Sequence, residues 1–244
     1  MYNIEKIIKG KNHKKIEYRK ISDLFDLFSG MTGVSKKWAD DGNCKFIDYK
    51  NAYNNVKIDI TLLQNATVKN LQQRELKKGD ILVTSASEIP EECAMSAVIE
   101  DDIPEKVFLD DHLFGLRLKE EFKGTINTTF IKYYFDSFEF RKNLHRAVRG
   151  VTRFYISNPN FMRLEIPILS LKEQNDIVQV LDMFIELKEN LQAELTARQK
   201  QYEYYRNKLL SFDESAESLD TLHTHTHTHT RIFLRTRNKI YKTY

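Results

Sequence analysis

The sequence is short of the residues that interrupt or cross-link a fold. Its 244 residues include only four prolines and eight glycines, which argues against a disordered or fibrous protein. The two cysteines, Cys44 and Cys93, form no CxxC pair, which fits plain thiols in a reducing compartment. We therefore expect a globular, cytoplasmic protein.

Long apolar runs and a strong charge imbalance are also missing. No run of about 18 apolar residues occurs, so no membrane span is expected. The first residues lack the apolar segment of a signal peptide. The net charge is only +3, and residues 231–244 hold five Lys or Arg and no acid, so 3 − 5 leaves −2 for residues 1–230. An anion-binding site in residues 1–230 must therefore be a local patch.

Against these shortages, the chain has enough apolar material for a core, with 41% hydrophobic and 11% aromatic residues. Four short runs predict β-strands, at residues 45–49, 80–86, 94–100 and 113–119. The spacing of Leu24, Phe25 and Phe28 predicts a short helix over 21–30 that ends at Gly30. Together these segments predict a mixed α/β (α+β) domain over residues 1–165.

A second helical segment is expected from Asn127, its N-cap, to Val148, with Gly150 ending it. Phe130, Tyr134 and Phe138 recur at four-residue steps along it. An aromatic stripe at this spacing is typical of a face that packs into a core. The stretch that follows is expected to form a loop and then a short strand ending in RLEIPI.

The segment from 166 to 213 changes character, because from Leu171 onward it has neither glycine nor proline. Apolar residues repeat with a 3.5-residue period over five heptads, which indicates a long coiled-coil helix. The seam positions chosen for partner contact are Ile177, Leu181, Phe184, Leu191, Leu195, Tyr202, Tyr205 and Leu209. A rod of about 60 Å is too long for one compact domain to cover, so a partner helix is expected. The alternative is a core helix of a bundle.

Residues 214–244 are expected to be a poorly ordered linker, repeat and basic tail. Four histidines, from His223 to His229, alternate with threonines. In an extended chain they share one face, which suits weak capture of Ni²⁺ or Zn²⁺ rather than a closed site. CAC encodes His and ACA encodes Thr, so we favour a CA-repeat in the gene at which slippage shifts the reading frame. No metal site is assigned.

Motifs for catalysis are scarce: the sequence has no P-loop, no GxGxxG, no HExxH and no GxSxG. SNPNF (157–161) resembles the Asn-Pro-Pro-Phe loop of adenine-N6 methyltransferases, in which an aromatic ring stacks on the target base. Here Asn160 replaces the second proline, and no glycine-rich loop is present to hold S-adenosylmethionine. We interpret the stretch as a turn and expect a non-catalytic protein.

Three segments are candidates for nucleic-acid contact. RKNLHRAVRGVTRFY (141–155) concentrates Lys and Arg without an acid, MTGVSKKW (31–38) sets small residues beside lysines, and TSAS (84–87) offers hydroxyls at a strand end. A solvated surface is the alternative for each. The candidate contacts are Thr32, Ser35, Lys36, Lys37, Trp38, Ser85, Ser87, Lys142, Arg146, Arg149, Arg153 and Tyr155.

The order of these segments resembles the specificity subunit of type I restriction-modification systems. IPILSLKEQNDIVQVLDMFIELKENL followed by RQKQYEYYRNKLLSF is similar to the family's conserved helical region. KISDLFDLFSGMTG, KKGDILVTSAS and RGVTRFYISNPNFMRLEIPI resemble parts of its target recognition domain, in the family's order. The resemblance covers about residues 15–213.

The resemblance implies a fold, partners and a division of labour. Family members have two recognition domains and two long helices, which space the domains and bind two methyltransferase subunits. This chain has one of each, so the resemblance implies a half-length form that acts as a homodimer on a split, palindromic double-stranded DNA target. S-adenosylmethionine is then expected on the partner methyltransferase, through which the restriction subunit joins. A pure assembly protein, a frame-shifted variant product and an autonomous methyltransferase are the alternatives.

Overall fold

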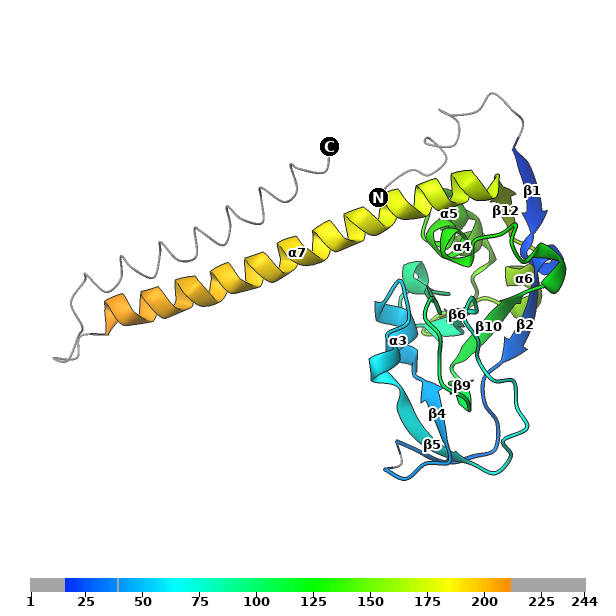
Figure 1. The fold of residues 1–244 in the computed structure, drawn as a ribbon, viewed down its shortest axis with the longest axis horizontal. Helices are drawn as coiled ribbons and strands as arrows, with labels where there is room; N and C mark the ends of the chain where they lie inside the picture. Colours follow the sequence, from blue (N-terminus) through cyan, green and yellow to red (C-terminus); the bar gives the residue numbers. More distant parts are fainter. Residues whose placement is uncertain (1–15, 39, 212–244) are drawn as a thin grey trace. The chain divides into compact units, whose positions relative to one another are not determined.

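The computed structural model describes residues 16–38 and 40–211 (Figure 1). They fall into two units that divide between Met183 and Phe184, inside a long helix. The histidine–threonine repeat and the basic tail lie outside the described residues. No helix among the described residues is both long enough and apolar enough to cross a membrane.

Two four-stranded sheets form the framework of the first unit. The first is antiparallel, in the order β2 (Phe25–Ser29), β10 (Leu113–Leu118), β6 (Ile81–Thr84) and β8 (Ser96–Val98). The second has the order β3 (Val34–Lys37), β5 (Gln64–Val68), β4 (Cys44–Ile47) and β9 (Val107–Leu109), with β4 and β9 parallel. The four strands expected from the sequence are thus present as β4, β6, β8 and β10.

The two sheets share one apolar core. Phe28, Leu82 and Leu113 from the first sheet are buried in one cluster with Ile47 and Leu109 from the second. Burial of each such side chain stabilises the fold by about 1.5–3 kcal/mol. The core therefore fixes the sheets against each other and holds the loops at their edges in place.

Two short ladders join segments that are distant in sequence. One pairs β1 (Glu17–Lys20) with β12 (Glu165–Ile168), so the expected strand in RLEIPI is present and closes against the start of the described chain. The other pairs β7 (Ala86–Ser87) with β11 (Phe154–Tyr155). Since β12 spans 165–168, the first unit extends past the expected domain boundary at residue 165.

The helix expected over 21–30 is wrong beyond its first turn. Helix α2 spans only Ile21–Leu24, and β2 follows directly. Phe25 and Phe28 are buried while Asp26 is exposed, and the whole strand pairs with β10. Pairing with a distant strand therefore overrides the local helical spacing. Gly30 does not end a helix; a Cβ there would lie 2.1 Å from the carbonyl oxygen of Asp110, so the position requires close backbone approach.

The second expected helix is broken in two. Asn127 caps α4 (Thr128–Phe135) as expected, accepting hydrogen bonds from the amides of Thr129 and Phe130. Ser137 then adopts an extended conformation and caps a new helix, α5 (Phe138–Ala147), through the Phe140 amide. A serine that accepts from the third residue after it is a strong N-cap, which explains the break.

The aromatic stripe is core, with one exception. Phe135 stacks on Phe140 with centroids 4.5 Å apart, and Phe161 packs edge-on against both. Phe130 and Tyr134 are also buried, whereas Phe138 is exposed because it starts α5. Phe161 belongs to α6 (Asn158–Met162), so SNPNF forms a short helix rather than a turn. A buried Phe161 is not available to stack on a base.

The described residues of the first unit also form three short 3-10 turns and one further helix. Helix α3 (Tyr49–Asn54) is capped by Asp48, whose carboxylate accepts from the Asn51 amide at 2.9 Å. The turns are η1 (Ile60–Leu62), η2 (Pro90–Glu92) and η3 (Glu120–Phe122).

Helix α7 runs unbroken from Leu171 to Leu210 (Figure 1), close to the expected span. It starts with a capping box, in which Ser170 and Glu173 bond each other's side chains and amides. The next residue, Gln174, is fully buried, donates to the carbonyls of Thr125 and Leu169, and accepts from the Asn127 amide. Gln174 thus fixes the start of α7 to the loop before α4.

The heptad seam changes environment along α7. Ile177 and Leu181 are buried within the first unit, so they are covered by the chain's own domain. Further along, the seam is exposed at Phe184, Leu191, Leu195, Tyr202 and Leu209, and half-buried at Tyr205. The part of the seam that a partner helix could cover therefore begins near Phe184.

Candidate nucleic-acid interface

Two of the three candidate segments lie side by side. The amide of Arg149 donates to the carbonyl of Tyr155 at 2.8 Å, and the amide of Tyr155 donates back at 2.9 Å. This closes a hairpin over residues 149–155, which we call the 149–155 hairpin. Its second arm, β11, pairs with β7, placing Tyr155 opposite Ala86 and Phe154 opposite Ser87. TSAS and the basic tract therefore meet in space.

The turn of this hairpin depends on Gly150. Its φ is +121°, and a Cβ there would lie 2.0 Å from the carbonyl oxygen of Arg153. Only glycine accepts this backbone without strain. The turn exposes Val151, whose surface is 88% accessible, while Tyr155 on the second arm is 49% exposed.

A cavity of about 420 Å³ adjoins the hairpin, and we call it the Tyr49 cavity. Arg153 and Ser87 line it, together with residues that sequence reasoning missed: Tyr49, Tyr53, Glu88, Glu92 and His112. The rings of Tyr49 and Tyr53 are stacked, with centroids 5.6 Å apart. No local motif marks these residues, because α3, η2 and the hairpin come together only in the folded chain.

The polar groups of the cavity differ in whether they form hydrogen bonds within the protein. The Tyr53 hydroxyl donates to Glu92, and this bond raises the pKa of Tyr53. The Tyr49 hydroxyl donates to the carbonyl of Ala86 at 3.2 Å, and burial raises the pKa of Tyr49. Arg153 makes no hydrogen bond or ion pair with any residue that the structure describes. Its guanidinium is available to a ligand at the cavity.

Most of the candidate hydroxyls are committed within the protein. Ser85 donates to the carbonyl of His112 at 2.7 Å, and Ser87 accepts from the Ile89 amide at 3.1 Å. Ser35 donates to the carbonyl of Thr67 at 3.0 Å. The amide of Thr32 donates to the Gln73 side chain at 2.7 Å. These residues shape the loops, and direct contact with nucleic acid stays a prediction for each.

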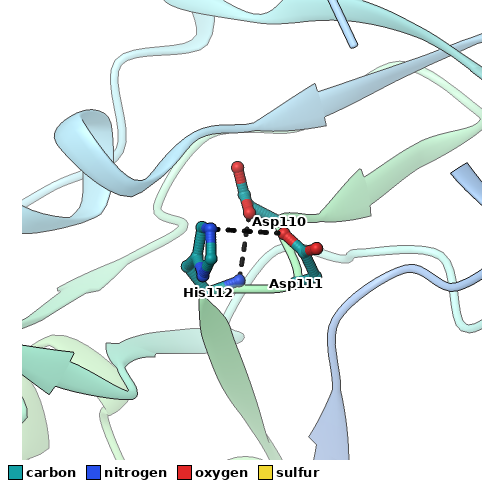
Figure 2. Close-up of side chains that lie close together, drawn as sticks. All are labelled: Asp110, Asp111 and His112. Atoms are coloured by element: carbon teal, nitrogen blue, oxygen red, sulfur yellow. Dashed lines mark hydrogen bonds and ion pairs between the residues drawn. The ribbon is translucent and has the colours of Figure 1, made fainter. Parts of the chain in front are cut away.

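The loop that follows β9 carries Asp110, Asp111 and His112 (Figure 2). Their possible ligand atoms lie within 4.8 Å of one another, a spacing that suits a metal ion. However, Lys37 Nζ lies 3.0 Å from Asp110 Oδ1 and 2.6 Å from Asp111 Oδ1. The lysine ammonium therefore already supplies the positive charge that these carboxylates need.

The electrostatics of this cluster follow from unequal burial. Burial raises the pKa of Asp110, which is nearly inaccessible. Hydrogen bonding to Asp110, and then to Lys37, lowers the pKa of the half-exposed Asp111 to about 2. The pair also raises the pKa of Lys37 above its usual value, although burial acts in the opposite direction. The charge of Lys37 is thus neutralised locally, which weakens it as a phosphate contact.

The rest of MTGVSKKW lies on or beside β3. Lys36 is opposite Thr67 in the β3–β5 register. Trp38 follows the strand at a φ of +53° and is 61% exposed, with its ring edge-on to Phe46 at 5.9 Å. An exposed tryptophan next to paired charges is suited to contact with a partner surface. This segment is linked to TSAS through the loop after β9, because Lys37 pairs with Asp111 and the carbonyl of His112 accepts from the Ser85 hydroxyl.

The basic tract divides into anchored and exposed residues. Arg141 is anchored, donating to the carbonyls of Glu91, Cys93 and Ala94. Lys142 lies 5.9 Å from the Phe138 ring centroid. Arg146 contacts Asn143, and Arg149 donates to the Arg146 carbonyl at 3.2 Å, so these two cations are neighbours. Their phosphate contacts stay predictions.

Comparison with known proteins identifies the family. Residues 13–197 match the model of the type I restriction modification DNA specificity domain. The chain is 44% identical over 75 residues to the Escherichia coli EcoR124I/EcoR124II specificity subunit, covering 29% of this chain and 19% of that one. It is 30% identical over 227 residues to the Escherichia coli EcoprrI specificity subunit, covering 86% and 53%.

Solved structures support the fold. The S subunit from M. genitalium superposes with a TM-score of 0.52 at 19% identity, covering 84% of this chain and 48% of that one. A chain from a type I R-M system complex gives 0.56 at 17% identity, covering 82% and 48%.

The chain spans at most about half the length of these relatives. Both named curated relatives are specificity subunits, in agreement with the expectation of a non-catalytic component. By the match over residues 13–197, the chain belongs to the family of type I restriction modification DNA specificity domains.

Proposed function

We propose that this chain reads one half of a bipartite DNA target as the specificity component of a type I restriction-modification complex. The observation that carries the proposal is the convergence of TSAS, the 149–155 hairpin and the Tyr49 cavity at one place. The arginines at this surface contact two parts of the DNA, the phosphate backbone and the base edges. Arg146 and Arg149 meet phosphates, and Arg153 reaches into the groove.

The second part of the proposal concerns assembly. The exposed seam from Phe184 to Leu209 pairs with the same seam of a second copy, which supplies the other recognition domain. A two-fold dimer presents two identical reading surfaces, so its target is a split palindrome. The paired helices also dock methyltransferase subunits, which bind S-adenosylmethionine and bring in the restriction subunit.

The exposed seam also fits two alternatives. A chain with this helix could assemble with methyltransferase while its domain reads no sequence, or could be a truncated variant product. The assembly protein differs from the proposed specificity component only in what the first unit does. Sequence selection by the whole chain is therefore the decisive measurement.

The test is enrichment of random-sequence duplexes by the full-length chain, alone and with its cognate methyltransferase. We expect a split palindrome to be enriched, with two identical half-sites at a fixed spacing. Enrichment of no sequence under either condition would remove DNA reading from the proposal. Light scattering on the same samples measures the dimer separately.

A further inference from the structure

We infer that the Tyr49 cavity reads a G·C base pair, with Arg153 binding guanine and Glu92 binding cytosine. The inference rests on the proposed DNA-reading function and assigns a base preference to one place in the fold. Three elements build the place: α3 with Tyr49 and Tyr53, η2 with Glu92, and the 149–155 hairpin with Arg153.

Arg153 has the chemistry for guanine. The O6 and N7 atoms of guanine both accept in the major groove, and an arginine fork binds them together. Two other arginines of the first unit are committed elsewhere: Arg117 binds both oxygens of Asp80 and Arg141 binds three carbonyls. Arg153 has no such partner among the described residues and lines an open cavity.

Glu92 has the complementary chemistry for cytosine. A carboxylate has about four acceptor positions, and the Tyr53 hydroxyl occupies one of them on Oε2. The remaining positions, including those on Oε1, can accept from the N4 amino group that cytosine presents in the major groove. Because this bond raises the pKa of Tyr53, the phenol keeps its proton and keeps the carboxylate oriented.

The placement of Glu92 is rigid. Arg141 donates to the carbonyls of Glu91 and Cys93, the residues on either side of it. Helix α5 therefore holds η2 in position at the wall of the cavity. A side chain that is fixed before binding loses little entropy when a base arrives, which favours selectivity.

The two charges lie in the same cavity. Both Glu92 and Arg153 line it, and both act electrostatically on the Tyr49 hydroxyl, so both lie near that group. A donor and an acceptor that line one cavity match a pair in which one base offers two acceptors and the other a donor. Guanine and cytosine meet this condition. Adenine sets one acceptor beside one donor, which fits an amide side chain better.

The test compares the half-sites enriched by full-length variants, with methyltransferase present. Wild type should enrich a half-site with one fixed G·C pair. Arg153→Ala and Glu92→Gln should each reduce discrimination at that pair by tenfold or more and leave the other positions unchanged. Arg153→Lys, which keeps the charge without the fork, should relax the same position. Glu91→Gln is the matched control, since it removes a carboxylate from the same 3-10 turn at an exposed residue that does not line the cavity.

The outcomes separate this inference from the proposed function. If wild type enriches a half-site and both variants reproduce its profile at every position, the G·C assignment is overturned while DNA reading stands. If wild type enriches nothing, the proposed function fails first. Binding to random duplex at low salt shows that each variant is folded. Tyr53→Phe gives a second test of the role of Glu92, because it frees the carboxylate from its hydrogen bond without removing it.

Discussion

The hydroxyl of Tyr133, on α4, donates to Asp182 Oδ1 on α7 at 2.5 Å. The other oxygen of Asp182 lies 3.0 Å from Lys57 Nζ, and Lys57 also pairs with Glu100 at 2.6 Å. Burial, and then this hydrogen bond, raise the pKa of Tyr133 well above its usual value. These contacts join the first turns of α7 to the rest of the first unit through one polar network.

Asp182→Ala should destabilise the first unit by about 1–3 kcal/mol, because the buried Tyr133 hydroxyl loses its acceptor. Urea unfolding followed by near-ultraviolet circular dichroism measures the change. Asp176→Ala, which removes another carboxylate of the same helix, should cost less than about 0.5 kcal/mol. Equal losses of unfolding free energy in the two variants would show that the Tyr133–Asp182–Lys57 network does not stabilise the first unit more than an ordinary surface carboxylate does.

Lys37→Met should destabilise the protein in a pH-dependent way. Without the ammonium, the pKa of Asp110, already raised by burial, rises further. The folded state then binds a proton more tightly than the unfolded chain, so stability falls as pH rises. We expect the difference from wild type in the free energy of unfolding, measured with urea, to be larger at pH 7 than at pH 5.

Lys123→Met is the control for that measurement. Lys123 pairs with Glu120 in an exposed position, and exposed pairs contribute little. Its gap from wild type should stay near zero at both pH values. A gap for Lys37→Met that does not change with pH would contradict the role of Lys37 as the counter-charge of Asp110.

Replacing Arg146 and Arg149 with alanine should flatten the salt dependence of DNA binding. Each phosphate contact adds about 0.9 to the slope of log affinity against log salt, so losing two should reduce the slope by about 1.8. Fluorescence anisotropy with a random duplex across salt concentrations measures it. Arg163→Ala, which removes an exposed arginine outside the candidate surface, should leave the slope unchanged. A double variant with the wild-type slope would show that Arg146 and Arg149 do not contact phosphates.

Leu191→Asp combined with Leu195→Asp should convert the expected dimer into a monomer. Both residues are exposed on the seam, and charges buried between two helices are costly. Light scattering gives the mass. Gln192→Asp with Gln199→Asp places the same charges one heptad apart off the seam and should leave the mass unchanged. A double leucine variant that keeps dimer mass would show that the seam does not join copies.

Local signals in the sequence were sufficient where structure is decided locally. The N-cap Asn127, the strand runs and the unbroken period of α7 all appear near their expected bounds. The sequence alone failed at β2, because pairing with β10 is contributed by residues about 90 positions away. It also missed the break at Ser137, where one side chain competes with an otherwise continuous helical pattern.

The candidate site was predictable in part and for the same reason. The basic tract and TSAS could be identified in the sequence from their residue types, and the β7–β11 ladder brings them together. Tyr49, Tyr53 and Glu92 carried no signal, since each is an ordinary residue until α3, η2 and the 149–155 hairpin meet. Nor did the sequence reveal that Lys37 is paired with Asp110 and Asp111, which weakens it as a candidate contact with DNA.

In the 149–155 hairpin, the backbone turn at Gly150 forms independently of the side chains that the turn carries. Backbone bonds between Arg149 and Tyr155, and the glycine itself, hold the turn without help from the side chains of Val151 or Arg153. Those two positions can therefore change by point mutation while the loop keeps its geometry and the aromatic core stays intact. Under the proposed function, such a loop would let a lineage acquire new targets by single substitutions, and it gives protein engineers two positions to randomise first.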